Sequence, residues 1–242
     1  MDAASTLPRS AGGTRRRSTV KPTIIFDFDG TLALGDGPIA AYARAIAARV
    51  GDDSFAARAD TVLTAFSTGE TSYRDGYDAV AQLAAAEQVP AAVVSAAYDD
   101  SRALLGTDGA AVSAPADLST FLLNIENCAH LVLATNAPGD GVVALLTTWG
   151  VADVFDDMHF RVGKPAGLLP ILTEALARGP VLSVGDIHEF DLAPAAHLGA
   201  DTALVGHAAA RADLPATMRG RTIADLYDQI AHWATSSASV SS

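Results

Sequence analysis

Hydrophobic residues in this chain occur in two patterns that alternate along most of its length. The first is a short continuous run of apolar or β-branched residues, as in Thr23–Phe26, and similar runs follow at 130–136, 180–186 and 200–206. The second is a longer segment with a helical spacing of apolar residues, found at about 138–149, 166–178, 189–198 and 222–234. Continuous apolar runs are typical of parallel strands that are buried on both faces. The alternation therefore predicts an α/β fold with a doubly wound parallel sheet.

The region from Pro38 to about Leu105 departs from this alternation, because it contains no candidate strand. Four segments in it have helical patterns, and two of them begin with Pro38 and Pro90, a residue that is favoured in the first turn of a helix. The four segments span 38–50, 54–67, 72–88 and 90–105, and residues 106–115 have the composition of a return linker. We therefore predict an α-helical cap domain at 36–112, inserted into an α/β core made of 22–35 and 113–234.

Composition and charge narrow the class of protein. Half of the 242 residues are hydrophobic, but no apolar run approaches the about 20 residues of a membrane span. The net charge is −12, and because residues 1–21 carry +4, the rest of the chain carries −16. Such an acidic body repels nucleic acid and anionic membranes, and the single cysteine, Cys128, excludes an internal disulfide. We expect a cytoplasmic monomer or homodimer, with a disordered basic tail at 1–21 and a second tail at 235–242.

Polar residues stand where the predicted strands end. These residues are Asp27 and Asp29 after the first run, Thr135 and Asn136 after the second, Asp186 after the third, and Lys164 in a loop before a helix. Ligands of open parallel sheets bind at the carboxyl ends of the strands, so we expect these side chains to meet. Several carboxylates cannot ionise together without a cation, and Mg²⁺ prefers such oxygen ligands. With a hydroxyl and an ammonium, they make up the set of groups that phosphoryl transfer needs.

The lysine at position 164 adds to this prediction. Of the 16 basic residues, only Lys21 and Lys164 are lysines. A compact ammonium can bridge a carboxylate and a phosphate oxygen where a planar guanidinium would not fit. The choice of lysine therefore favours a role in the site over a chance position on a surface loop.

Four short motifs resemble, in the same order, those of the haloacid dehalogenase-like (HAD) hydrolases. They are "DFDGT" at 27–31, "LATN" at 133–136, "GKP" at 163–165 and "GDIHEFD" at 185–191. The four helical segments after the first motif resemble the C1 cap of that family, and the resemblance spans roughly residues 22–206. It implies a Rossmann-like core with an inserted cap, and an activity like that of phosphoglycolate phosphatases or phosphomutases.

The resemblance assigns a role to each residue that matches a motif. Asp27 would be the nucleophile that becomes an aspartyl phosphate, and Asp29 the general acid and then the general base. Thr135, with Asn136 beside it, would bind the transferring phosphoryl group. Lys164 would neutralise the charges of the nucleophile and the phosphate.

The same resemblance implies a metal site and close backbone contacts to the phosphate. Mg²⁺ would be held by the carboxylates of Asp27 and Asp186 and the backbone carbonyl of Asp29, with Asp191 supporting that shell. Gly30 and Thr31 follow the paired acids, where backbone amides must approach the phosphate closely.

Two positions depart from the pattern of the family, and one segment of the cap is a candidate to contact the substrate. Phe190 stands before Asp191, where many members of the family have a small polar residue, and the acid expected after "DGTL" comes later, as Asp36. In the cap, the segment 67–77 is the best candidate to face the site. Arg74 in it could clamp a second anionic group of the substrate, or it could be a solvated helix residue.

The reaction and the substrate are only partly determined by these motifs. Dehalogenases of the family lack the second acid, so Asp29 indicates phosphoryl transfer. We therefore expect a Mg²⁺-dependent phosphatase that acts on a small phosphomonoester, with a phosphomutase as the alternative and a non-catalytic phosphate-binding relative as a third hypothesis. A receiver-type signalling domain is contradicted by the order of the motifs and by the cap. Phosphoglycolate, sugar phosphates and nucleoside monophosphates are all open as substrates.

Overall fold

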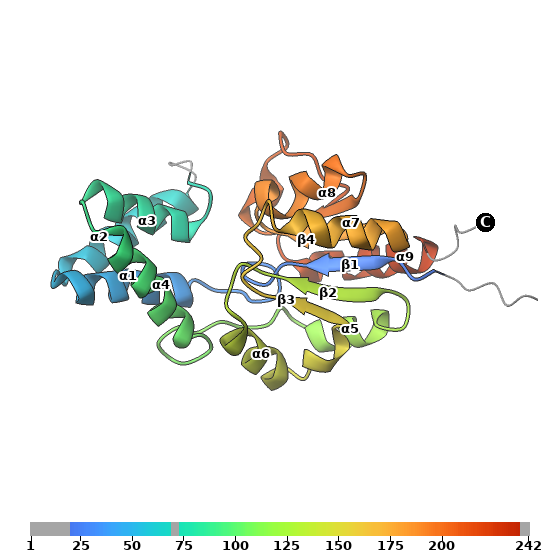
Figure 1. Ribbon diagram of the computed structural model, residues 1–242, viewed down its shortest axis with the longest axis horizontal. Coiled ribbons are helices and arrows are strands. Elements are labelled where there is room, and N and C mark those ends of the chain that lie inside the picture. Colours follow the sequence, from blue (N-terminus) through green and yellow to red (C-terminus); the bar gives the residue numbers. More distant parts are fainter. Residues whose placement is uncertain (1–19, 69–72, 238–242) are drawn as a thin grey trace, which may run out of the picture.

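The computed structural model describes residues 20–68 and 73–237 of the chain, and the centre of this part is a six-stranded parallel sheet (Figure 1). The strands are β1 (Thr23–Phe26), β2 (His130–Ala134), β3 (Asp157–His159), β4 (Val181–Gly185), β5 (Asp201–Leu204) and β6 (Met218–Arg219), in the order β3-β2-β1-β4-β5-β6. All four residues of β1 are buried, as expected for a central strand with helices on both sides.

Helices cover both faces of the sheet. On one face, α5 (Leu118–Ile125), α6 (Gly139–Thr148) and α9 (Tyr227–Ser237) contribute to the hydrophobic cluster that contains Ile24 and Phe26 of β1. On the other face, α7 (Leu168–Arg178) and α8 (Ala193–His197) contribute to the cluster that contains Ile25. Successive side chains of a strand point to opposite faces, so β1 contributes to both clusters. The predicted doubly wound α/β fold is confirmed.

Parallel pairing brings the carboxyl ends of the central strands to one edge of the sheet. Phe26 of β1 lies opposite Leu133 of β2 and Val184 of β4. Asp27 continues the ladder, because its N–H donates to the carbonyl oxygen of Val184 at 2.9 Å. The residues that follow these three strands therefore leave the sheet next to one another.

Between β1 and β2 the chain forms four helices, which we call the helical insert. They are α1 (Gly37–Val50), α2 (Ser54–Ser67), α3 (Gly76–Ala86) and α4 (Ala91–Ala103). The insert encloses a hydrophobic cluster of its own, which includes Tyr42, Ile46 and Phe55. The arrows of β1 and β2 point toward the insert in Figure 1, so the insert lies at the edge of the sheet where the polar residues were predicted to meet. The prediction of four helices in this region is confirmed.

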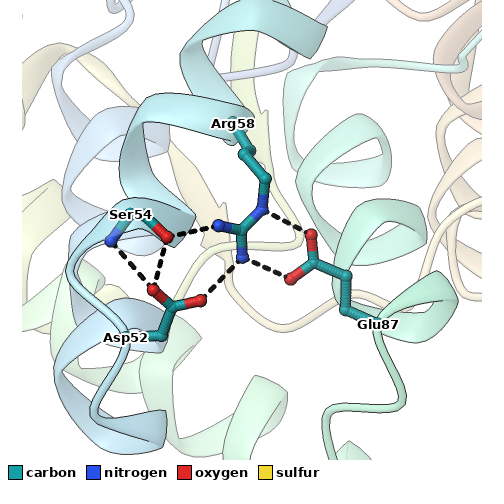
Figure 2. Close-up of polar contacts among 4 residues, drawn as sticks. All are labelled: Asp52, Ser54, Arg58 and Glu87. Carbon is teal, nitrogen blue, oxygen red and sulfur yellow. Dashed lines mark hydrogen bonds and ion pairs between the residues drawn. The ribbon is translucent and has the colours of Figure 1, made fainter.

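A network of polar side chains joins two helices of the insert (Figure 2). Arg58 of α2 donates through Nε and Nη2 to the two carboxylate oxygens of Glu87, both at 2.6 Å, and Glu87 follows the last residue of α3. The same guanidinium contacts Asp52 and Ser54 at the start of α2. These groups are partly exposed to solvent, so the network fixes the geometry of the helix ends more than it stabilises the fold.

Several elements differ from the sequence-based predictions. Strands β3 and β6 were not predicted, because β3 is three residues long with exposed ends and β6 has two residues. Helix α5 was also missed. The helix predicted at 189–198 is a π-helical turn, His188–Leu192, followed by α8, and short 3₁₀ turns occur at Ala152–Val154, His207–Ala210 and Ile223–Leu226.

The described part of the chain includes only short pieces of the two predicted tails, and it includes the single cysteine. Helix α9 continues to Ser237, so the first three residues of the tail predicted at 235–242 are helical. The other residues of that tail, and residues 1–19 of the basic tail, lie outside the described residues, as do 69–72 of the segment 67–77.

Cys128 is partly buried and packs against the main hydrophobic cluster. Among the described helices, none is long and apolar enough to cross a membrane.

Candidate active site

The paired acids after β1 are arranged around a turn at Gly30. Asp27 is buried, whereas the side chain of Asp29 is 34% exposed. The intervening Phe28 points into the hydrophobic core. Gly30 has a φ of +76°, and a Cβ atom at this position would overlap the carboxylate of Asp186. A glycine is therefore needed both for the turn and for the close approach of the Asp186 carboxylate.

Lys164 connects two of the carboxylates. Its Nζ donates to Asp27 Oδ1 at 2.6 Å and to Asp191 Oδ1 at 2.7 Å, and only 3% of the lysine side chain is exposed. Burial disfavours the ammonium, but the charges of the two carboxylates outweigh this effect and raise the pKa of Lys164 above its ordinary value. Lys164 is therefore a permanent positive charge in contact with Asp27.

The residues after β2 contribute to the same edge. Thr135 is buried, and its Oγ1 accepts a hydrogen bond from the N–H of Ala137 at 3.0 Å, which leaves the hydroxyl proton available to a ligand. The side-chain oxygen of Asn136 accepts from the N–H of Lys164 at 2.8 Å. Asn136 was predicted to bind the phosphoryl group beside Thr135. Its contact in the structure is to the lysine loop, which it holds against the end of β2.

Three carboxylates are close enough to share a metal ion. Oxygen atoms of Asp27, Asp186 and Asp191 lie within 4.8 Å of one another. Asp186 Oδ1 is buried and has no hydrogen-bond partner among the described residues. A buried carboxylate oxygen without a donor is costly unless a cation binds it, and a set of oxygen ligands suits Mg²⁺. The residues at this position therefore fit the predicted divalent cation.

Burial and the proximity of the other carboxylates raise the pKa values of Asp186 and Asp191. Burial, with the charges of Asp27, Asp191 and Asp29, raises the pKa of Asp186 well above its ordinary value. Burial also raises the pKa of Asp191 to about 6, although Lys164 opposes the shift. Asp191 is further held by the N–H of Ile187, which donates to its Oδ2 at 3.1 Å. With both oxygens already hydrogen-bonded, Asp191 has the contacts expected of a residue that supports the metal ligands.

In the absence of a divalent metal, we expect the stability of the protein to fall as the pH rises. Asp186 and Asp191 have raised pKa values in the folded protein, about 6 for Asp191, against an ordinary value of 3.8. The folded state therefore binds more protons than the unfolded state between about pH 4 and pH 6, and its stability decreases as the pH rises through this window. In EDTA, Tm measured by circular dichroism should be lower at about pH 6.5 than at about pH 4.5. Addition of Mg²⁺ should remove the difference.

The Asp186→Asn variant is the control for this prediction, since it lacks one of the two acids with raised pKa values and keeps all other acidic residues of the chain. Its Tm in EDTA should depend less on pH than that of the wild type. A wild-type Tm that is the same at both pH values, or an equal pH dependence in the two proteins, would contradict the interpretation.

One residue of this site, Arg102 in the last turn of α4, was not predicted from the sequence. Its Nη1 donates to Asp29 Oδ1 at 2.9 Å and to the hydroxyl of Tyr77 at 3.0 Å, and only 1% of its side chain is exposed. Although 34% of the Asp29 side chain is exposed, desolvation raises the pKa of its carboxyl, and Arg102 opposes this shift. An arginine near the end of an amphipathic helix is usually solvated, so only the tertiary structure identifies this contact.

The other residues of the insert that were singled out have different surroundings. Arg74 donates to Asp75 at 3.0 Å and lies 4.7 Å from the ring centre of Phe190. Phe190, the unusual residue before Asp191, is thus in contact with the insert. Tyr77 packs against two other tyrosine rings, and Tyr73 against Phe66. The contacts of Arg74 are therefore to residues of the protein, and its role in substrate binding stays a prediction.

Comparison with solved structures identifies proteins of similar fold. No protein-family model and no curated protein matches the chain. The HAD-hydrolase YfnB from Bacillus subtilis, bound to magnesium, is similar with a TM-score of 0.60 and 17% identity over 87% of this chain and 98% of that one. A HAD phosphatase from Thermococcus onnurineus has a TM-score of 0.58 and 18% identity over 86% and 97%. The L-2-haloacid dehalogenase RSc1362 has a TM-score of 0.56 and 16% identity over 87% and 98%.

The chain therefore has the fold of the haloacid dehalogenase-like hydrolases, with a helical insert after the first strand. The matched structures include both a phosphatase and a dehalogenase, so the fold does not by itself select the reaction. The activity has to be argued from the residues of the site.

Proposed function

We propose that the chain is a Mg²⁺-dependent hydrolase of small phosphomonoesters that acts through a phosphorylated Asp27. The observation that carries the proposal is the buried ammonium of Lys164, which contacts both Asp27 and Asp191 beside a set of carboxylates suited to a divalent cation. A dianionic phosphate needs such positive charge at the nucleophile. Asp29 favours phosphoryl transfer over halide displacement, because an alkoxide leaving group needs a proton and a halide does not.

The proposed reaction has two steps, and the protons balance across them. In the first step, a carboxylate oxygen of Asp27 attacks phosphorus, the bond from phosphorus to the leaving oxygen breaks, and Asp29 donates its proton to that oxygen. In the second step, water attacks the same phosphorus, Asp29 takes a proton from the water, and the bond from phosphorus to Asp27 breaks. Phosphate is released, and both carboxyls return to their initial states.

The other residues would bind and orient the phosphoryl group. The hydroxyl of Thr135 has a proton to donate. The N–H groups of Gly30 and Thr31, predicted to approach the phosphate, donate instead to the carbonyl oxygens of Ala33 and Phe28 at 2.9 and 3.3 Å. The hydroxyl of Thr31 is buried and lacks a hydrogen-bond partner among the described residues. Buried polar groups are normally hydrogen-bonded, so this hydroxyl is a candidate to bind a ligand. Mg²⁺, held by Asp27, Asp186 and the Asp29 carbonyl with Asp191 in support, would supply positive charge that screens the phosphate from the nucleophile.

The exposure of the site limits the size of the substrate. Asp27 and Lys164 are 9% and 8% exposed, and Arg102 of the insert covers one side of Asp29. We therefore propose a small phosphorylated metabolite as the substrate.

A phosphomutase would use the same core residues but would pass the phosphoryl group to a second hydroxyl. A screen of small phosphomonoesters for release of inorganic phosphate, with Mg²⁺ present, separates the two activities. Phosphate release at a rate that matches substrate loss supports the phosphatase. Isomerisation of the substrate without release of phosphate would identify the mutase, and no reaction with any compound would favour a binding protein.

Removal of the metal should abolish the activity. With any substrate found in the screen, EDTA should reduce phosphate release by at least about 10³-fold, because the charges of Asp27 and the phosphate would then repel each other. Addition of Mg²⁺ in excess over the chelator should restore the rate. Full activity in metal-free buffer would show that the carboxylates of Asp27, Asp186 and Asp191 do not act through a cation.

A further inference from the structure

We propose that Arg102 is a positioning residue for Asp29, so that the helical insert completes the acid–base group of the active site. This inference rests on the proposed phosphatase function and goes beyond it, since no motif of the sequence includes Arg102. It follows from three features of the guanidinium, namely its contacts, its burial and its place in the insert.

The contacts of Arg102 fix one oxygen of Asp29. Among the described residues, no other side chain hydrogen-bonds to this carboxylate, and Arg102 contacts Oδ1 at 2.9 Å. The other oxygen, Oδ2, is then left to carry the proton that is transferred to the leaving group. Arginine keeps its own protons at all ordinary pH values, so it can orient Asp29 without taking part in the transfer.

The position of the guanidinium is itself fixed from the side of the insert. Nη1 also donates to the hydroxyl of Tyr77 at 3.0 Å. The ring of Tyr77 packs against those of Tyr42 and Tyr98, with ring centres 5.6 and 5.5 Å away. The hydrophobic cluster of the insert therefore determines where Arg102 meets Asp29.

The burial of Arg102 is not explained by the stability of the insert. Its Nε and Nη2 are buried and have no hydrogen-bond partner among the described residues. A buried guanidinium with two unpaired nitrogens is costly, and a hydrophobic side chain of similar size would stabilise the insert more. Besides its hydrogen bond to Tyr77 within the insert, the interaction that offsets this cost is the ion pair with Asp29, across the boundary between the insert and the sheet.

The test compares phenyl phosphate with p-nitrophenyl phosphate, two substrates of similar shape whose leaving groups differ in their need for a proton. In Arg102→Gln, kcat/KM for phenyl phosphate should fall by about 100-fold, whereas kcat/KM for p-nitrophenyl phosphate should fall by less than about 5-fold. Arg102→Lys should restore part of the rate with phenyl phosphate. Asp29→Asn should show the same selective loss, and the double variant should be no slower than Asp29→Asn alone, because Arg102 acts through Asp29.

Arg161→Gln is the matched control. Arg161 lies in the loop after β3 and pairs at 3.6 Å with Asp99, which is also on α4, so this variant weakens the same boundary without touching Asp29. Its ratio of kcat/KM for the two substrates should equal that of the wild type. An equal fall with both substrates in Arg102→Gln, the same change of ratio in Arg161→Gln, or additive losses in the double variant would overturn the inference while leaving the phosphatase function intact. A wild type that hydrolyses neither compound nor any other phosphomonoester would overturn both.

Discussion

An Asp27→Asn variant should release phosphate at least about 10⁴-fold more slowly than the wild type, because the amide cannot attack phosphorus. The fold should be unaffected. Asparagine has the shape of aspartate, and the loss of one negative charge relieves repulsion with Asp186 and Asp191, which lie within the same group of carboxylates. Lys164 keeps its second partner, Asp191, at 2.7 Å. In metal-free buffer, Tm should therefore be equal to or higher than that of the wild type.

Phosphate release measures the first part of this prediction and circular dichroism the second. Asp36→Asn is the matched control, since Asp36 is an exposed acid just before α1 whose side chain makes no capping hydrogen bond to the helix. Its activity should equal that of the wild type. If Asp27→Asn retained comparable activity, Asp27 would not be the nucleophile, and if its Tm fell sharply, the role of Asp27 would be structural.

A Lys164→Arg variant should lose activity by about 10² to 10³-fold, although it keeps the positive charge. The ammonium lies between two carboxylate oxygens at 2.6 and 2.7 Å, and the lysine side chain is 3% exposed. A planar guanidinium is larger and cannot place one nitrogen between both oxygens without displacing Asp27. The measurement is kcat and KM for the best substrate of the phosphate-release screen.

The other lysine of the chain provides the control. Lys21 is exposed and donates to the carbonyl oxygen of Glu126 at 3.3 Å. Lys21→Arg should therefore leave kcat and KM unchanged. A near-normal rate in Lys164→Arg would show that charge alone is needed at this position, and the scarcity of lysine would then have no bearing on the site.

Much of the arrangement around β1 could be predicted from the sequence because it depends on local pattern and on one general property of parallel sheets. The run Thr23–Phe26 indicates a buried strand, and carboxyl ends of parallel strands share an edge. Asp27, Asp186 and Lys164 are therefore expected near one another, and the structure brings them into one group with Asp191. Their catalytic roles are proposals that the variants above test.

The contribution of the insert could not be predicted in the same way. Arg102 reaches Asp29 across 73 positions of sequence, and nothing in the pattern of α4 distinguishes it from a solvated arginine. Sequence reasoning instead selected Arg74, which contacts Asp75 and Phe190. Contacts between two separately packed units depend on how the units meet, and a hydrophobic pattern carries information only on which face of each helix is buried.

The separate hydrophobic cluster of the helical insert has a consequence for protein engineering. Because Tyr42, Ile46 and Phe55 pack within the insert and not against the sheet, a designer could graft a different helical segment onto the core to change the choice of substrate. Such a graft would remove Arg102 together with α4, and the chimera would then retain its nucleophile while losing the partner of its acid–base group. A successful graft should therefore carry an arginine in the equivalent turn of its last helix.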